Sequence, residues 1–528
     1  MTRAVLTVFL AGLAGCNGCP TTETTTAVAR IPVSMDVVLD GRITALPELL
    51  DRFETLVDAM MTDDQIEALE KEWIAATTIN PFDVDAMEKA GLDVHDRFAG
   101  GLDLENRRAL WVLPASEPAK LLANLRALFE RQYGSEEKSN QRVLRYDRAF
   151  GPDRVESAAL MRSGRLVLVG LGVGASALLQ EASGLEVDGS ALEVLPASPE
   201  TDVVRVRIPE PKKSVPALLS LLPDRLRRRL SREKVTALAD AMQVAGMDLR
   251  WLDHGMRIAA EASFLQSAQD DVDTVLSARG EVPPTMEALS LPDAVMMLQV
   301  SGNPTRLFDA FVPPGSPFRE RLNTARRQGR MRLDFEKDVL PRLTGHLSFA
   351  LGAADLSRTD LRTVLDNPLT VMWYVLGLGI DKPLMDRLAQ DISSDSRVEV
   401  KRRRSGGVEV LAFSSTSRGR PMRIVDVAES ERTLVVASDA ELMDRVLSRP
   451  ERAASMPPLW LQLRFDALEQ ALRTFRPSRL PLLIRPIWGQ FLDALALLDA
   501  LEARVVQDMG IVQMTVDLTV DPPKRDAS

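Results

Sequence analysis

The sequence predicts an α+β protein with two tandem related domains, each a largely antiparallel sheet covered by helices. Three observations support this prediction. Short apolar runs of strand character alternate with helical patterns. The same order of segments occurs twice along the chain, and each series closes with a hairpin that has glycine at its turn. The 528 residues suffice for two or three domains, and 45% hydrophobic with 27% charged residues is typical of folded proteins.

The two series match from their first segments onward. Both open with a predicted strand, at 33–39 and at 294–300, and helical patterns follow. The next pairs are strands at 96–101 and 347–352, strands around Trp111 and Trp373, and helices at 117–129 and 382–392. Because insertions between the pairs are small, we expect the two halves to share one fold.

The correspondence continues to the end of each series. The paired segments are strands at 142–146 and 408–413, 157–161 and 422–427, and 166–169 and 434–437, helices at 175–182 and 440–447, and strands at 203–208 and 459–465. The closing hairpins turn at Gly255 and Gly510. Residues 266–292 are polar and contain Gly280, Pro283 and Pro284, which is typical of a linker. We therefore expect domains at 31–265 and 293–521, and a polar tail at 522–528.

The N-terminus has the features of an export signal. Arg3 precedes an apolar run at 4–13 that is too short to span a bilayer. The run ends in Leu13-Ala14-Gly15-Cys16, so the segment resembles a bacterial lipoprotein signal peptide with its lipobox. This resemblance implies removal of residues 1–15 and acylation of Cys16, and two or three acyl chains anchor a protein stably in a membrane. The predicted role of Cys16 is therefore lipidation.

The segment after the lipobox predicts a tether. Residues 16–30 are rich in Thr, which suits a flexible lipidated stalk. Asn17 follows Cys16 where an aspartate would indicate inner-membrane retention, so the resemblance favours the outer membrane over the inner one, facing the periplasm or the cell surface. Cys19 is the second of two cysteines, which excludes a disulfide framework and leaves it as a free thiol or a partner for another chain.

The composition excludes some classes of protein. A net charge of -10 disfavours nucleic-acid binding. No stretch after Cys16 is long and apolar enough to span a membrane. In its layout the body resembles uncharacterised duplicated α+β envelope lipoproteins of unknown function, a resemblance that implies no site residues.

The glycine-rich run at 170–174, Gly-Leu-Gly-Val-Gly, is the strongest candidate for a ligand loop, since it follows a strand and precedes a helix. Its third glycine comes one residue too early for GxGxxG, and no lysine follows. The equivalent turn at 437–439, Ala-Ser-Asp, has no glycine, and Glu441 is available for helix capping. We therefore interpret both as structural turns.

Histidines and aspartates give no metal or catalytic pattern. His95 and His346 lie at equivalent places before Phe98 and Phe349, and His254 lies in a hairpin turn. No metal-ligand spacing accompanies them, so we expect structural or solvent-exposed roles. Four aspartates, Asp83, Asp85, Asp93 and Asp96, lack the calcium-loop pattern and suit helix capping. No GxSxG elbow or Ser, His and Asp set stands out, so we predict no catalytic residue, cofactor or metal.

Two basic clusters and one apolar run remain. The clusters are at 225–232 and at 401–404; either could bind an anionic lipid or cell-wall polymer, but solvated faces of an acidic chain are the preferred interpretation. The run at 491–501 predicts a helix buried against its own sheet or between the domains. If it lined a groove instead, the protein could hold an acyl chain.

These features predict a lipid-anchored cell-envelope protein that acts as a non-catalytic interaction or scaffold module. Its expected partners are the membrane, through Cys16, and an envelope protein. The first alternative is a carrier or sensor of an apolar ligand, an acyl chain or lipid, in a cavity between sheet and helices. The second is a hydrolase whose site the sequence does not reveal.

Overall fold

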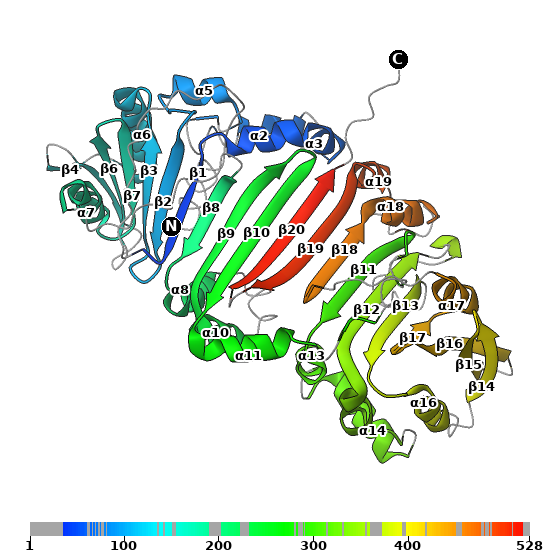
Figure 1. Ribbon diagram of the computed structural model, residues 1–528. Coiled ribbons are helices and arrows are strands. Elements are labelled where there is room, and N and C mark those ends of the chain that lie inside the picture. The colour runs from blue at the N-terminus through cyan, green and yellow to red at the C-terminus, as the bar shows by residue number, and fades with distance from the viewer. Residues whose placement is uncertain are drawn as a thin grey trace. The chain divides into compact units, whose positions relative to one another are not determined.

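The computed structural model describes residues 35–520, apart from 75–78, 150–154, 189–201, 222–231, 284–288, 359–371, 393–397, 450–456, 481–484 and further gaps of one to three residues. The chain divides into two compact units, residues 1–265 and 266–528. Both contain antiparallel strands and helices, so the predicted α+β class is confirmed (Figure 1). None of the described helices combines the length and the apolar character that crossing a membrane requires.

Unit 1 contains ten described strands. They are β1 (Val37–Arg42), β2 (Arg97–Asp103), β3 (Arg108–Pro114), β4 (Glu137–Asn140), β5 (Val143–Ala149), β6 (Val155–Ser163), β7 (Leu166–Leu171), β8 (Asp202–Ile208), β9 (Met242–Leu252) and β10 (Gly255–Phe264). Antiparallel pairing places them in the order β10, β9, β8, β1, β2, β3, β7, β6, β5, β4.

Unit 1 has seven described helices, which are α2 (Ala45–Arg52), α3 (Glu54–Met60), α5 (Val84–Lys89), α6 (Pro118–Tyr133), α7 (Ala175–Asp188), α8 (Pro211–Leu221) and α10 (Arg232–Ala241). Of these, α6 and α7 cover the two faces of one half of this sheet. Leu121 of α6 packs in a core with Leu39 and Trp111, and Leu178 of α7 packs with Leu110 on the opposite side. We call these two sides of the sheet the α6 face and the α7 face.

Strand β3 shows why the chain folds in this way. Its residues Ala109, Leu110, Trp111 and Val112 are all buried, although successive side chains point to opposite faces of a sheet. Ala109 and Trp111 enter the core under α6, whereas Leu110 and Val112 enter the core under α7. A continuous apolar run is what a strand covered on both sides requires.

Unit 2 also contains ten described strands. They are β11 (Ala294–Ser301), β12 (Leu343–Ala353), β13 (Met372–Ile380), β14 (Val398–Ser405), β15 (Val408–Ser417), β16 (Arg420–Ser430), β17 (Thr433–Ala437), β18 (Leu459–Arg464), β19 (Leu498–Asp508) and β20 (Ile511–Val520). Their antiparallel order is β20, β19, β18, β11, β12, β13, β17, β16, β15, β14. Each strand thus takes the same place as the strand ten numbers earlier does in unit 1.

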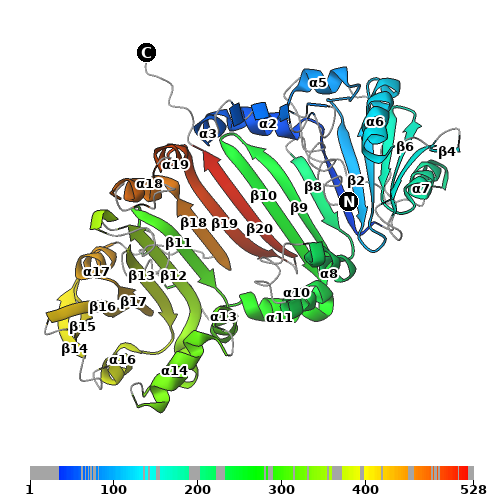
Figure 2. The same cartoon turned by 180° about the vertical axis from the view of Figure 1, so that it is seen from behind.

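The helices of unit 2 occupy comparable positions on their own sheet (Figure 2). They are α11 (Gln266–Leu276), α13 (Pro304–Phe311), α14 (Pro317–Arg327), α16 (Met385–Ile392), α17 (Ala440–Leu447), α18 (Phe465–Arg473) and α19 (Trp488–Leu495), with the short helices η1 (Phe335–Val339), η2 (Leu340–Arg342) and η3 (Leu356–Arg358). Met443 of α17 packs with Val435 on one face, and Ala389 of α16 packs with Leu434 on the other.

The predicted linker differs from the structure. Residues 266–276 form helix α11 instead of an open connection. Leu289 and Leu291 are buried in the core under α17, beside Ala294. The polar composition hid these two leucines, which give the end of the segment a packed position in unit 2.

The turn between β2 and β3 depends on a buried carboxylate. Asp103 accepts hydrogen bonds from the backbone N–H of Asn106 at 3.0 Å, from its side-chain amide at 2.8 Å and from Arg108 Nε at 2.7 Å. Burial opposes ionisation of Asp103, but these hydrogen bonds and the charge of Arg108 together outweigh it and lower the pKa of the carboxyl group.

This lowered pKa predicts a loss of stability in acid. Because the unfolded pKa is about 3.9, the contribution of Asp103 is complete above that pH and is lost as the pH falls through the lower, folded value. We expect Asp103→Asn to destabilise unit 1 at pH 7. We also expect the variant to lose less stability than the unchanged protein when the pH falls from 6 to 3. Urea unfolding at pH 7, 6 and 3 measures both effects. Glu105→Gln is the control, since the Glu105 side chain in the same turn is 72% exposed; an equal effect of both variants would contradict the assignment.

Candidate functional site

The glycine run at 170–174 forms a structural turn between β7 and α7. Gly172 and Gly174 have φ of 97° and 73°, which favour glycine. The N–H of Gly172 donates to the Ser157 carbonyl at 2.8 Å, and the N–H of Ala175 donates to the Gly172 carbonyl at 3.2 Å. Since these amides already have protein acceptors, they are not presented to a phosphate group.

The equivalent turn in unit 2 uses a different cap. Asp439, rather than the predicted Glu441, accepts a hydrogen bond from the N–H of Leu442 at 2.9 Å and begins α17. The Ser438 N–H donates to the Tyr374 carbonyl at 3.0 Å. An aspartate cap therefore makes the connection that glycines make in unit 1.

The equivalent histidines have different environments. The His95 side chain is 76% exposed, and its Nε2 lies 3.9 Å from Glu88. His346 is buried, and its Nδ1 lies 2.9 Å from the Ser301 hydroxyl on the facing strand β11. Sequence reasoning missed this Ser and His pair because 45 residues separate its members. Both side chains are at most 8% exposed, so the pair joins two strands instead of meeting a substrate. His254 is exposed in the β9–β10 turn.

Three of the four aspartates, Asp83, Asp93 and Asp96, make contacts that support local structure. Asp83 caps α5 by accepting from the Ala86 N–H at 3.1 Å, and Asp93 pairs with Arg165 at 2.9 Å. Burial raises the pKa of Asp96, and the hydrogen bond from the Arg97 N–H opposes that shift. Asp85 lies in the first turn of α5. Among the described residues, no group of three or more His, Cys, Asp or Glu could hold a metal ion.

The basic cluster at 401–404 lies on β14, which comes last in the order of paired strands in unit 2 and forms an edge there. Lys401 pairs with Glu399 at 3.2 Å, Arg402 with Glu409 at 2.7 Å, and Arg403 with Asp426 at 2.9 Å. These ion pairs neutralise much of the cluster, and charged side chains on an edge strand disfavour pairing with other chains. The cluster at 225–232 lies outside the described residues except for Arg232, where α10 begins, and Cys16 and Cys19 also lie outside them.

The apolar run at 491–501 is not one helix, so this prediction was wrong. Helix α19 ends at Leu495, and strand β19 begins at Leu498. Leu492 and Leu495 pack with Leu472 of α18 in a small core. The run contains both a helix end and a strand start, and a continuous apolar stretch cannot distinguish these by periodicity.

The shallow pocket beside Phe308 in unit 2 is too small for a substrate. Its volume is about 20 Å³, which is roughly the space of one water molecule. Arg319, which lines it, pairs with Asp309 at 2.9 Å and Glu336 at 2.6 Å. The guanidinium group is therefore already neutralised by carboxylates.

The strands at one end of each sheet have a feature that the sequence analysis did not identify: each has one apolar and one polar face. In unit 1 the α6 face continues onto β8, β9 and β10. There the side chains are all apolar and make up what we call the apolar face of β8–β10: Val204, Val206, Ile208, Ala245, Met247, Leu249, Trp251, Met256, Ile258, Ala260 and Ala262. Most are half-buried, and Met247 is 43% exposed.

Described helices lie mainly at the ends of these strands. Figures 1 and 2 show α2 and α3 at one end of β8–β10 and α8 and α10 at the other, with β9 and β10 open to view from both sides. Ala45 of α2 packs with Val204, and Phe53 lies 6.5 Å from Trp251 between ring centroids. These contacts lie at the Trp251 end of the strands, and α8 contacts β9 at the other end.

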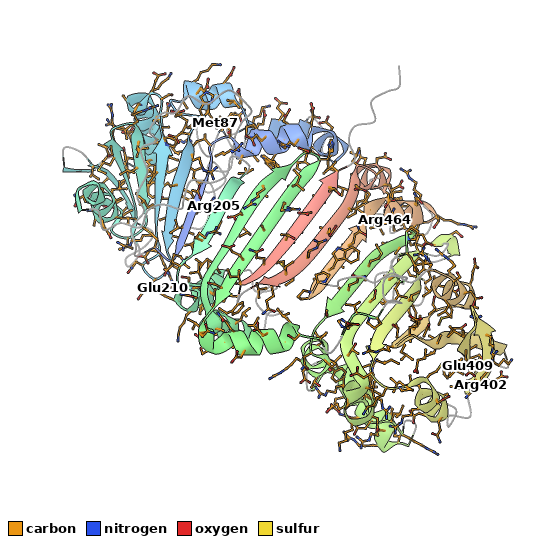
Figure 3. The ribbon with its side chains drawn as sticks, in the orientation of Figure 1. Met87, Arg205, Glu210, Arg402, Glu409 and Arg464 are labelled. Carbon is orange, nitrogen blue, oxygen red and sulfur yellow. The ribbon has the colours of Figure 1, made fainter. Side chains whose placement is uncertain are left out.

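The α7 face of the same three strands carries charged side chains, among them Arg205 of β8, which is labelled in Figure 3. Asp248 lies 3.7 Å from Arg205 Nε, 3.3 Å from Arg207 and 3.5 Å from Arg250. Arg205 is only 5% exposed and Asp248 8%. Three guanidinium groups thus surround one carboxylate on this face, whereas the side chains of the apolar face of β8–β10 carry no charge.

Unit 2 repeats this arrangement on β18, β19 and β20. Its apolar face comprises Leu459, Leu461, Leu463, Leu501, Ala503, Val505, Val512, Met514, Val516 and Leu518. Met514 is 42% exposed. On the other face Glu502 accepts a hydrogen bond from the Trp460 indole N–H at 2.7 Å and one from Arg504 at 3.2 Å. Glu502 of β19 lies opposite Gln462 of β18, just as Asp248 of β9 lies opposite Arg205 of β8 in unit 1.

Comparisons with known proteins identify no family. No family model matches the chain, and no curated protein matches its sequence. Among solved structures, crystal form I of TP0453 is 12% identical with a TM-score of 0.25, and covers 49% of this chain and 88% of that chain. Crystal form III of TP0453 is 13% identical with a TM-score of 0.24, and covers 49% and 90%.

The structural role of the glycine turn is open to a stability test. A Cβ at Gly170 would lie 2.8 Å from the Ala175 carbonyl oxygen, so we expect Gly170→Ala to destabilise unit 1 by about 1–3 kcal/mol. At Gly489 in α19 a Cβ would meet nothing within 4 Å, and Gly489→Ala should stabilise unit 2 by up to about 1 kcal/mol. Urea unfolding compares the two variants. Unchanged stability with lost nucleotide binding in Gly170→Ala would support a ligand loop instead.

Proposed function

We propose that this is a lipid-anchored protein of the cell envelope that acts without catalysis as an interaction module. The observation that supports the proposal is the apolar face of β8–β10, together with its counterpart on β18–β20. Soluble monomeric proteins rarely expose contiguous apolar patches larger than a few hundred Å², and such patches commonly mark interaction sites. The apolar face of each set of strands is the binding surface in this proposal.

The contrast between the two faces supports a specific surface. On β9, Met247 and Leu249 lie on the apolar face, while Asp248 and Arg250 on the other face belong to the charged network. A sheet end that had only to remain in water would need polar side chains on both faces. The strands instead keep one face free of charged side chains in both units.

The same pattern supports a duplicated unit as part of the proposal. The ten described strands of each unit pair in the same order, and Asp248 and Glu502 occupy matching positions. Two copies of one fold would give the protein two equivalent binding surfaces. A superposition of the units that aligned strands from different places in the order would contradict the duplication.

The binding surface can be mapped by crosslinking in bacterial cells. We expect a photo-crosslinking amino acid in place of Met247 or Met514 to give adducts with lipid or protein. The same group in place of Val244 or Val506 should give several-fold fewer, because these residues lie on the opposite faces. The comparison is matched for exposure, since the four side chains are 43%, 42%, 41% and 42% exposed. Equal labelling from both faces would contradict the proposed surface.

The anchor has a separate test. Cys16 is the lipidated residue of the proposal, because the lipobox ends there. We expect Cys16→Ala to block acylation and lipoprotein-type processing, and to release the protein from the membrane fraction or leave it as the unprocessed form. Labelling with a fatty-acid analogue and fractionation measure this, with Cys19→Ala as the matched control. Normal processing and acylation of Cys16→Ala would refute the anchor.

A further inference from the structure

The apolar face of β8–β10 has a chemistry that selects among occupants. Its eleven side chains are aliphatic or Met, apart from Trp251. The indole N–H of Trp251 already donates to Glu48. Protein interfaces have about one hydrogen bond per 100–200 Å² and are enriched in Tyr and Arg. A face with no free hydrogen-bonding side chain instead complements an uncharged hydrocarbon.

The dimensions also fit an extended chain. The stretch of β9 from Ala245 to Leu252 has eight residues and is about 26 Å long at the usual rise of a strand. One acyl chain extends across half of a bilayer's hydrocarbon core, about 15 Å. An acyl chain along β9 would therefore fit within the apolar face.

A cation lies at one end of this face. The Arg52 guanidinium lies 5.5 Å from the centroid of the Trp251 ring, and its Nη1 donates to the Leu252 carbonyl at 3.0 Å. Arg52 is exposed, and none of the described carboxylates forms an ion pair with it. Its remaining N–H groups can donate to an anion at the Leu252 end of the strands.

We propose that unit 1 binds a long-chain fatty acid, with its hydrocarbon along the apolar face of β8–β10 and its carboxylate at Arg52. One apolar chain with one anionic end matches an apolar face with one cation at its end. This inference rests on the proposed function, because it assigns an occupant to the surface proposed there.

Palmitate binding to residues 20–528, without the proposed anchor, tests the hydrocarbon part. We expect saturable binding by titration calorimetry, and crosslinks from a diazirine-bearing palmitate on β9 and β10. Met247→Glu, which puts a charge against the chain, should weaken binding at least roughly tenfold. Val244→Glu on the opposite face should leave it within about twofold, the size expected of a remote surface charge. Met247→Gln, read in parallel with thermal unfolding, separates lost binding from lost folding.

The Arg52 contact has a readout that a structural role would not change. Arg52→Ala should weaken palmitate binding by roughly fivefold at most, as expected for an exposed ion pair. Binding of hexadecanol, which has the same chain without the charge, should not change. An equal loss for both ligands would overturn the assignment of Arg52 to the carboxylate.

Three outcomes overturn the fatty-acid inference and separate it from the proposed function. If palmitate does not bind but Met247 crosslinks to an envelope protein in cells, the surface stands and its occupant is a protein. If Met247→Glu converts a dimer into a monomer in sedimentation, the occupant is a second copy of the chain. If palmitate does not bind and the two faces crosslink equally, both the inference and the proposed function fail.

Discussion

In each unit the sheet is wider than the helix layers that cover it, and the remaining features depend on this mismatch. In unit 1, α6 and α7 enclose β3 so completely that Leu110 and Trp111, on opposite faces, both have no measurable exposure. Beyond β1 the two layers give way to helices at the strand ends, yet the apolar pattern of the α6 face continues. Apolar surface left in water costs about 25 cal/mol per Å² relative to burial. An occupant that covered these strands would recover that free energy.

The charged face helps to hold together strands whose other face no described helix layer covers. Arg205 and Asp248 are nearly buried, so removal of one partner would leave an uncompensated charge. Arg207 also reaches Glu261 on β10 at 3.8 Å, which extends the network over three strands. The network links β8, β9 and β10 through side chains, while the strands' own side chains on the opposite face are uncharged. Folding and binding are thus assigned to different faces.

The order of elements could largely be predicted because it depends on local signals. The runs around Trp111 and Trp373 are strands, and the helix predicted at 440–447 is α17. The failures have physical causes. Two leucines in a polar segment, Leu289 and Leu291, pack in a core through tertiary contacts that composition does not reveal. The run at 491–501 crosses a helix end, where the side-chain period changes from 3.6 to 2.

The candidate site was harder to predict, because alternation of apolar and charged residues looks the same whether the apolar face is covered or open. The pattern Val204-Arg205-Val206-Arg207-Ile208 predicts a strand with one buried side. Only the placement of α6 and α7 on other strands determines that this side stays half-exposed. Since Met247 is already 43% exposed, a change there removes little packing. The open face is therefore a place where binding chemistry can vary with little effect on the fold.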